Sequence, residues 1–358
     1  INGTSCAGET DYDFVLWKIS GTSSTNCAAI QSTGGAGEVK CNFSTDGVTG
    51  LSATGNAPGG YPACFDNEFE TSQPVVAGEV YLLVVQNFSN STSGFTLDFS
   101  STTAGVINYT APTSVNWTGG SNTVWTTTAN WGGCVAPSCT VDGIVTTASS
   151  NQPVLTTGTY TVNNLTINPG ASLTLNAGVT LQVCGNFTNN GNLIASSTST
   201  VEFVGTGVQV VSGSFTGADA MGNLTVNKTS GSVQLSNDVT AAGNFLTSNA
   251  TSIFNINSRI LSVAGNFTNN SAGTTFTGVT GSTLSFTGAA NQNYSPGGAL
   301  ILNNVTINQS TASTVTITGS DDMFIGTSGV LTLTSGQIIT GALEVEVTNT
   351  ASGAVTTI

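Results

Sequence analysis

The strongest constraint in this sequence is a hexapeptide that occurs twice. Gly-Asn-Phe-Thr-Asn-Asn begins at Gly185 and again at Gly265, 80 positions later. The segments that follow also correspond, because residues 200–205 resemble 282–288 and residues 223–227 resemble 304–308. The offsets stay between 80 and 83. An internal repeat of this kind indicates a chain built from similar structural units.

A shorter period lies inside the long repeat. Asn164 precedes the first Gly-Asn-Phe by 21 positions, Asn223 precedes the related Gly243 by 20, and Gly265 follows Gly243 by 22. Segments within this period alternate apolar and polar residues. A period of about 20 residues predicts a parallel β-solenoid, in which each coil buries its apolar side chains against its neighbours. The alternative is an array of β-sandwich modules of about 80 residues each.

Composition favours an all-β fold. Charged residues make up 6% of the 358 residues, and residues that build surface helices are sparse. No apolar run approaches the roughly 18 to 20 residues of a membrane-spanning helix, so we expect no membrane insertion. Four basic residues against 18 acidic ones give a net charge of −14, which excludes nucleic acid as a partner.

Within the solenoid, alternation predicts which side chains point inward. Leu173, Phe187 and Ile253 are examples, while Thr, Ser and Asn between the apolar positions face outward. Asn at equivalent places should form hydrogen-bonded ladders between coils. Corners where the chain turns should need the backbone angles that glycine reaches easily; the candidates are Gly185, Gly205, Gly243, Gly265 and Gly288.

The sequence predicts three regions. Residues 1–103 contain most acids, four cysteines and strands separated by turn-rich loops, which indicates an antiparallel β-sandwich of jelly-roll or CUB-like type. Residues 104–150 form a Trp-rich linker and cap. Residues 151–358 form a right-handed parallel β-solenoid. Because the chain begins at an isoleucine and the repeat runs to the end, we expect a piece of a longer protein.

Three tryptophans in the middle region have two interpretations. Trp117, Trp125 and Trp131 lie just ahead of the first repeat. The first coil of a solenoid exposes apolar side chains and unpaired backbone groups, so these residues are suited to cap it. Alternatively, the three side chains are glycan contacts.

The cysteines indicate an oxidising compartment. Cys6, Cys27, Cys41 and Cys64 are candidates for two disulfides of undetermined pairing. Cys134 and Cys139 are candidates for a small stapled loop, and a zinc site is the weaker alternative because the chain has no His. Cys184 lies in an alternating strand and is expected to be a buried free thiol.

Acidic residues of the first region form a candidate calcium site. Asp11, Asp13, Asp66, Glu68 and Glu70 could supply carboxylate oxygens, and a bridge between Cys6 and Cys64 would bring the two groups together. Solvated loop acids are the alternative. We expect no other cofactor.

Several segments resemble a known module. Residues 9–17, 41–44, 49–52, 77–84, 86–89 and 94–99 are similar to a sandwich module of large secreted proteins of Bacteroidota. Those proteins usually leave the cell by type IX secretion and include adhesin-like and gliding-motility-associated proteins. The tryptophan pattern of residues 116–131 resembles the lead-in to solenoids on surface proteins of the same bacteria. The resemblance implies a secreted or cell-surface location and transfers no enzyme motif.

Catalytic chemistry has little support. Without His, Ser-His-Asp and Cys-His arrangements are impossible, and the solenoid carries two basic residues with scattered acids. We therefore expect an extracellular structural protein without catalysis, either an adhesin-like stalk or a subunit of a surface filament. Its partners would be further copies of itself, other surface proteins or glycans. The alternatives are a carbohydrate-binding surface protein and, less favoured, a polysaccharide-degrading β-helix enzyme.

Overall fold

The structure is a computed structural model that divides the chain into two compact units. It describes residues 2–3, 12–19, 37–43, 49–52, 69–76, 79–88, 95–97, 112–132, 135–148, 150–271 and 280–357. The N-terminal unit comprises 1–112 with 132–134, and the solenoid unit comprises 113–131 with 135–358.

The N-terminal unit contains an antiparallel sheet with the order β3-β2-β6. Its described strands are β1 (Asn2–Gly3), β2 (Tyr12–Ile19), β3 (Glu38–Asn42), β4 (Gly50–Ser52), β5 (Phe69–Thr71), β6 (Val80–Asn87) and β7 (Phe95–Thr96). β1 pairs with β7 in antiparallel orientation, and β4 pairs with β5 in parallel. The antiparallel sheet agrees with the sequence-based prediction.

Both faces of β2 are buried near its start. On one face, Val15 and Trp17 pack with Cys41 of β3. On the opposite face, Tyr12 and Phe14 are also buried. Because β2 lies between β3 and β6 and is covered on both faces, it is the central strand of this sheet.

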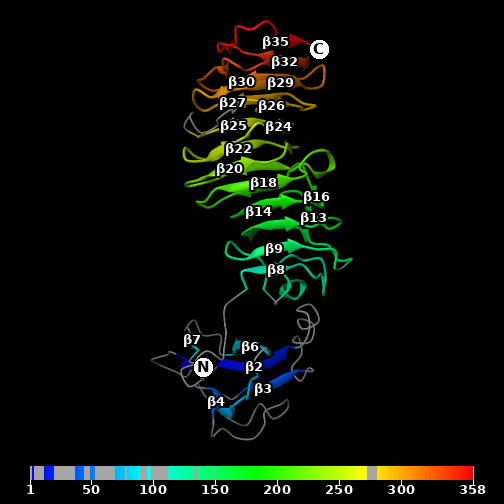
Figure 1. The fold of residues 1–358 in the computed structure, drawn as a ribbon, viewed down its shortest axis with the longest axis vertical. Coiled ribbons are helices and arrows are strands. Elements are labelled where there is room, and N and C mark those ends of the chain that lie inside the picture. Colours follow the sequence, from blue (N-terminus) through cyan, green and yellow to red (C-terminus); the bar gives the residue numbers. More distant parts are fainter. Residues whose placement is uncertain are drawn as a thin grey trace. The chain divides into compact units, whose positions relative to one another are not determined.

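The solenoid unit is a stack of coils (Figure 1), and most of the described coils contribute one strand to each of three faces. The first face consists of β8 (Ser114–Asn116), β9 (Asp142–Val145), β12 (Leu165–Ile167), β15 (Phe187–Asn189), β18 (Gln209–Gly213), β20 (Ser232–Leu235) and β23 (Ile253–Asn255), and continues with β28 (Ile301–Leu302), β31 (Met323–Ile325) and β34 (Val345–Val347). Neighbouring strands within it are parallel.

The other two faces are built in the same way. The second face consists of β10 (Val154–Leu155), β13 (Ser172–Leu175) and β16 (Asn192–Ala195), then β21 (Val239–Ala241), β24 (Ile260–Val263), β26 (Thr283–Phe286), β29 (Asn304–Asn308), β32 (Leu331–Ser335) and β35 (Val355–Thr357). The third face consists of β11 (Thr159–Val162), β14 (Thr180–Val183), β17 (Thr200–Phe203), β19 (Asn223–Val226), β22 (Phe245–Thr247), β25 (Phe267–Asn269), β27 (Gln292–Ser295), β30 (Thr314–Ile317) and β33 (Gln337–Ile339). The 3₁₀ helices η2 (Thr128–Asn130) and η4 (Gly217–Asp219) lie in the connections.

One continuous apolar core runs through the solenoid unit, from Val115 to Leu331. Alternation places every second residue of a strand inside, as in β14, where Leu181 and Val183 are buried. Aromatic rings stack along the third face: the ring centroids of Phe245 and Phe267 are 5.0 Å apart, and those of Phe267 and Tyr294 are 5.3 Å apart. Each coil is therefore held by its neighbours, as expected of a solenoid.

The long sequence repeat does not correspond to a whole number of coils. Its hexapeptide lies at β15 on the first face and again at β25 on the third face. The first-face strands β18, β20 and β23 intervene, so the repeat spans three and two-thirds coils. The same sequence can occupy different faces because every face offers a short parallel strand with one side buried.

Two local predictions need correction. In β23 the buried residue is Phe254, which pairs with Val233, whereas Ile253 is only partly buried. The alternation is shifted by one position because Phe254 and Ile256 point inward together. Strands of the solenoid also begin at Ser114, ahead of the predicted start at residue 151.

In the part of the chain that the structure describes, no helix is long and apolar enough to span a membrane.

Candidate functional site

The Trp-rich segment closes the first coil. Trp117, Trp125 and Trp131 are buried, and Trp131 packs edge-on against both others, with ring centroids 5.0 Å from Trp117 and 4.7 Å from Trp125. Their indole N–H groups donate to backbone carbonyls, Trp117 to Asn151 and Trp131 to Trp125, each at 2.7 Å. These residues extend the solenoid core. None of the three presents an open ring face, which argues against their role as glycan contacts.

Asn130 organises the loop that carries these tryptophans. Its buried amide oxygen accepts the backbone N–H groups of Ser121 and Asn122, both at 2.9 Å. Its amide nitrogen donates to Asn122 Oδ1 at 2.8 Å and to the carbonyl of Val124 at 2.9 Å. A buried amide with all four hydrogen bonds satisfied holds a loop in one conformation.

A disulfide joins the cap to the solenoid. Cys139, in the turn before β9, bonds to Cys184, which follows β14, with a Cα–Cα distance of 5.3 Å. The predicted pairing of Cys139 with Cys134 and the predicted free thiol at Cys184 are therefore wrong. Stacking of successive coils brings these residues together across 45 positions of sequence. Cys41 is also disulfide-bonded, while Cys6, Cys27, Cys64 and Cys134 lie outside the described residues.

Asparagine side chains form ladders that connect successive coils, as predicted. On the first face, Asn164 Oδ1 accepts the backbone N–H of Asn186 at 2.7 Å, and Asn186 Oδ1 accepts that of Val210 at 2.8 Å. On the third face, a second ladder consists of equivalent bonds at 2.7 to 2.8 Å that run through Asn223, Asn244, Asn266 and Asn293. Each bond stabilises the stack by about 1 kcal/mol.

The ladders explain the glycine of the repeated hexapeptide. A Cβ at Gly185 would lie 2.4 Å from Asn164 Oδ1, and one at Gly265 would lie 2.5 Å from Asn244 Oδ1. The glycine therefore leaves room for the ladder amide of the preceding coil. Positive φ, the reason predicted from sequence, applies to Gly205 but not to Gly185, Gly243, Gly265 or Gly288.

Two buried polar networks occur at equivalent places of the long repeat. In the first, Gln209 Nε2 donates to the carbonyls of Val183 and Gly185 at 2.8 and 2.6 Å, and Lys228 Nζ donates to Gln209 Oε1 at 2.6 Å. In the second, Gln292 Nε2 donates to the carbonyls of Val263 and Gly265, and Gln309 Nε2 donates to Gln292 Oε1 at 2.6 Å.

Sequence reasoning missed these four residues. Gln292 follows Gln209 by 83 positions and Gln309 follows Lys228 by 81, within the offsets of the long repeat. Extending the comparison of the two repeats to their polar residues would have found them. In the second repeat, a neutral Gln309 thus takes the place of Lys228.

Three of the described acids of the solenoid accept backbone hydrogen bonds from the next coil. Asp142 Oδ1 accepts the backbone N–H of Asn164 at 3.1 Å and so begins the first ladder. Asp238 accepts from the N–H of Ile260 at 2.9 Å, and Asp322 accepts from that of Glu344 at 2.7 Å. Among the described residues, no group of three or more His, Cys, Asp or Glu gathers.

The candidate calcium ligands are only partly described. Asp11, Asp66 and Glu68 lie outside the described residues. Asp13 is buried in β2, and Glu70 is buried in β5. The Nζ atom of Lys40 lies 4.0 Å from Glu70 Oε2 and donates to Thr71 Oγ1 at 2.5 Å. Glu70 therefore has a buried cation as a neighbour.

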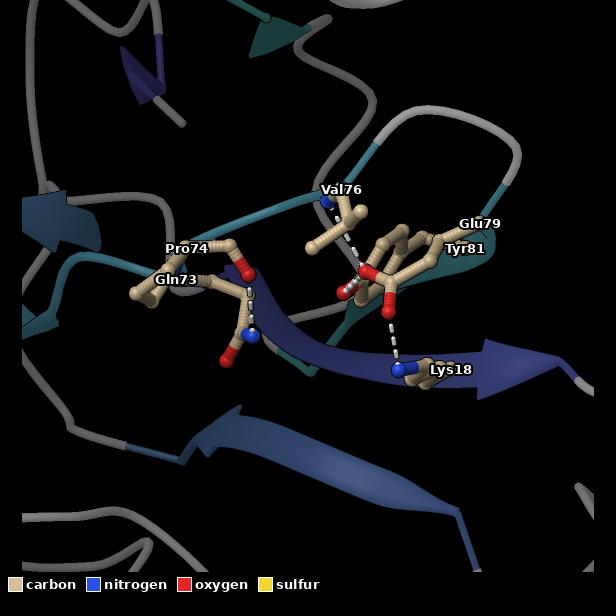
Figure 2. Close-up of polar contacts among 6 residues, drawn as sticks. All are labelled: Lys18, Gln73, Pro74, Val76, Glu79 and Tyr81. Atoms are coloured by element: carbon tan, nitrogen blue, oxygen red, sulfur yellow. Dashed lines mark hydrogen bonds and ion pairs between the residues drawn. The ribbon is translucent and has the colours of Figure 1, made fainter.

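A separate polar cluster joins β2 to β6 (Figure 2). Glu79 accepts hydrogen bonds from the ammonium of Lys18, from the hydroxyl of Tyr81 at 2.7 Å and from the backbone N–H of Val76 at 3.0 Å. The bond from Lys18, followed by those from Tyr81 and Val76, lowers the pKa of Glu79 to about 2. The cluster links Lys18 of β2 with Val76 and with Glu79, the residue before β6.

Comparison with known proteins yields no relative: no family model matches the chain, and no curated protein or solved structure matches it either.

Proposed function

We propose that this chain is an extracellular structural protein whose solenoid serves as a stalk or as the shaft of a surface filament, without catalysis of its own. We also propose that the solenoid is right-handed and that the N-terminal unit is a β-sandwich. The protein would be secreted or held at the cell surface of an organism of Bacteroidota type. The proposal also includes association with further copies or other surface molecules.

The observation that carries the proposal is the linkage between coils. Every coil shares the core of its neighbours, and the asparagine ladders add side-chain hydrogen bonds to the backbone pairing. A rod bonded along its axis in this way resists bending and stretching. Such a rod suits a protein that holds another surface at a distance.

Two further observations support the proposal. The disulfide between Cys139 and Cys184 and the disulfide-bonded Cys41 are typical of oxidising, extracellular compartments. The solenoid acids whose hydrogen bonds are described above accept backbone N–H groups, a structural use that leaves them poorly placed for acid–base chemistry.

Electron microscopy tests the proposal. Cells that produce the protein, labelled with an antibody against the solenoid unit, should carry the label on rods or fibres outside the cell. Label confined to the cell interior would contradict the extracellular stalk. Purified chain in dilute buffer then separates the two forms, because filament subunits should form fibres with a fixed axial repeat and stalks should remain separate rods.

A further inference from the structure

The solenoid contains one lysine whose burial is unusual for a charged group. Lys228 follows β19, and its side chain is fully buried. Its ammonium donates one hydrogen bond, to Gln209 Oε1 at 2.6 Å. Its backbone is held on both sides, because its N–H donates to Ser252 Oγ at 3.1 Å and its carbonyl accepts from Thr251 Oγ1 at 2.7 Å. A buried ammonium with a single neutral acceptor is costly.

Among the described residues, no carboxylate is hydrogen-bonded to this ammonium. Residues 179–190, 204–216, 223–236 and 244–255 include the strands that precede and follow the coil of Lys228 in the stack. Their ionisable side chains are Lys228 itself and the disulfide-bonded Cys184. Glu202 on β17 faces outward, where it accepts from the amides of Gln182 at 2.8 Å and Asn227 at 2.9 Å.

The two nearby aspartates are also engaged elsewhere. Asp219 accepts from Ser214 Oγ at 2.9 Å and from the N–H of Leu193 at 3.1 Å. Asp238 accepts from the N–H of Ile260 at 2.9 Å. Lys228 therefore carries its charge without a partner of opposite charge among these groups.

We propose that Lys228 is a proton-controlled weak point of the solenoid: while its ammonium is charged, the coil around β18 and β19 opens more readily than the equivalent coil at β27 and β29, and loss of the proton closes it. The second repeat supplies the comparison within the same molecule, because Gln309 makes the same hydrogen bond without a charge.

The direction of the pH dependence follows from burial. Burial lowers the pKa of Lys228 from 10.5 to about 8. Below pH 8 the group is protonated in both the closed and the open coil, so the cost of the buried charge is fully present. Between about pH 8 and 10.5 the closed coil has lost the proton that the open coil still binds, so closure is favoured increasingly as pH rises. From pH 6.5 to 9.5 the local opening constant should fall about 30-fold.

Hydrogen exchange followed by mass spectrometry tests the proposal on the intact chain. The readout is a ratio: the protection factor of residues 204–231 divided by that of residues 288–313. Taking the ratio cancels the intrinsic effect of pH on amide exchange. In the native chain this ratio should rise about 30-fold between pH 6.5 and 9.5. In Lys228→Gln the ratio should be high at both pH values, and at pH 6.5 it should exceed the ratio of the native chain by a factor on the order of 10².

The reciprocal variant Gln309→Lys is the matched control. It should transfer the weak point, so that residues 288–313 exchange faster at pH 6.5 and recover at pH 9.5. A native ratio that does not change with pH, or a Lys228→Gln ratio equal to the native one at pH 6.5, would overturn the proposal. If Gln309→Lys does not fold, the native chain and Lys228→Gln decide the question alone.

Discussion

Replacement of Gly185 by Ala tests how the ladders shape the repeat. The new Cβ would lie 2.4 Å from Asn164 Oδ1 and 2.9 Å from Asn164 Cγ. The amide of Asn164 must then move and release the N–H of Asn186, which it accepts at 2.7 Å. Overpacking costs about 1 to 3 kcal/mol and the lost hydrogen bond about 1 kcal/mol more. Urea unfolding followed by circular dichroism should therefore show a loss of about 2 to 4 kcal/mol.

Two further variants isolate the cause. Gly207→Ala is the matched control, because a Cβ there meets no atom within 4 Å, and its stability should stay within about 0.5 kcal/mol of the native chain. In the Asn164→Ala background, Gly185→Ala should cost at least about 1 kcal/mol less than in the native chain, because the clashing amide is absent. Equal costs in both backgrounds would refute the steric explanation.

Three other predictions concern a buried hydroxyl, the solenoid disulfide and an ion pair. Tyr294→Phe should stabilise the chain by about 1 kcal/mol in urea unfolding, because the buried Tyr294 hydroxyl has no hydrogen-bond partner among the described residues; a loss of stability would show that the hydroxyl is satisfied. Cys184→Ala and Cys139→Ala should each lower stability by about 2 to 4 kcal/mol, because each opens the same 45-residue connection; clearly different losses would contradict a single shared bond. The hydrogen bonds of ionised Glu79 contribute stability above its ordinary pKa of 4.5, and this contribution is lost as pH falls toward 2. In a carboxyl-detected NMR titration, Lys18→Met should raise the pKa of Glu79 toward 4.5. An unchanged pKa of Glu79 in this variant would show that Lys18 is not the main cause of the shift.

The solenoid could be predicted from the sequence because its periods are local. Spacings of 20 to 22 residues and alternation, as in 173–175, specify a coil and its buried side. Likewise, repeated asparagines at one place in the period specify a ladder. Ile253 was misplaced because Phe254 competes for the same inward position, and the larger aromatic side chain is the one buried.

Other features depend on how the coils stack, which sequence does not state. The pairing of Cys139 with Cys184 follows from the arrangement of the cap against the coils. The reason for glycine at Gly185 lies in a side chain 21 positions earlier, Asn164, rather than in its own backbone angle. The burial of Lys228 depends on the acceptor that Gln209 provides one strand away. In each case the deciding contact joins residues that lie far apart in sequence.

We infer that the solenoid is a rod stabilised coil by coil along its axis. Single-molecule stretching of the whole chain between its two ends tests this inference. Coils should open as discrete steps, each releasing roughly 7 to 8 nm, the extended length of about 22 residues. Cys184→Ala, which removes the bond to Cys139, should lengthen the total extension by roughly 15 nm. A gradual extension without steps would contradict the inference.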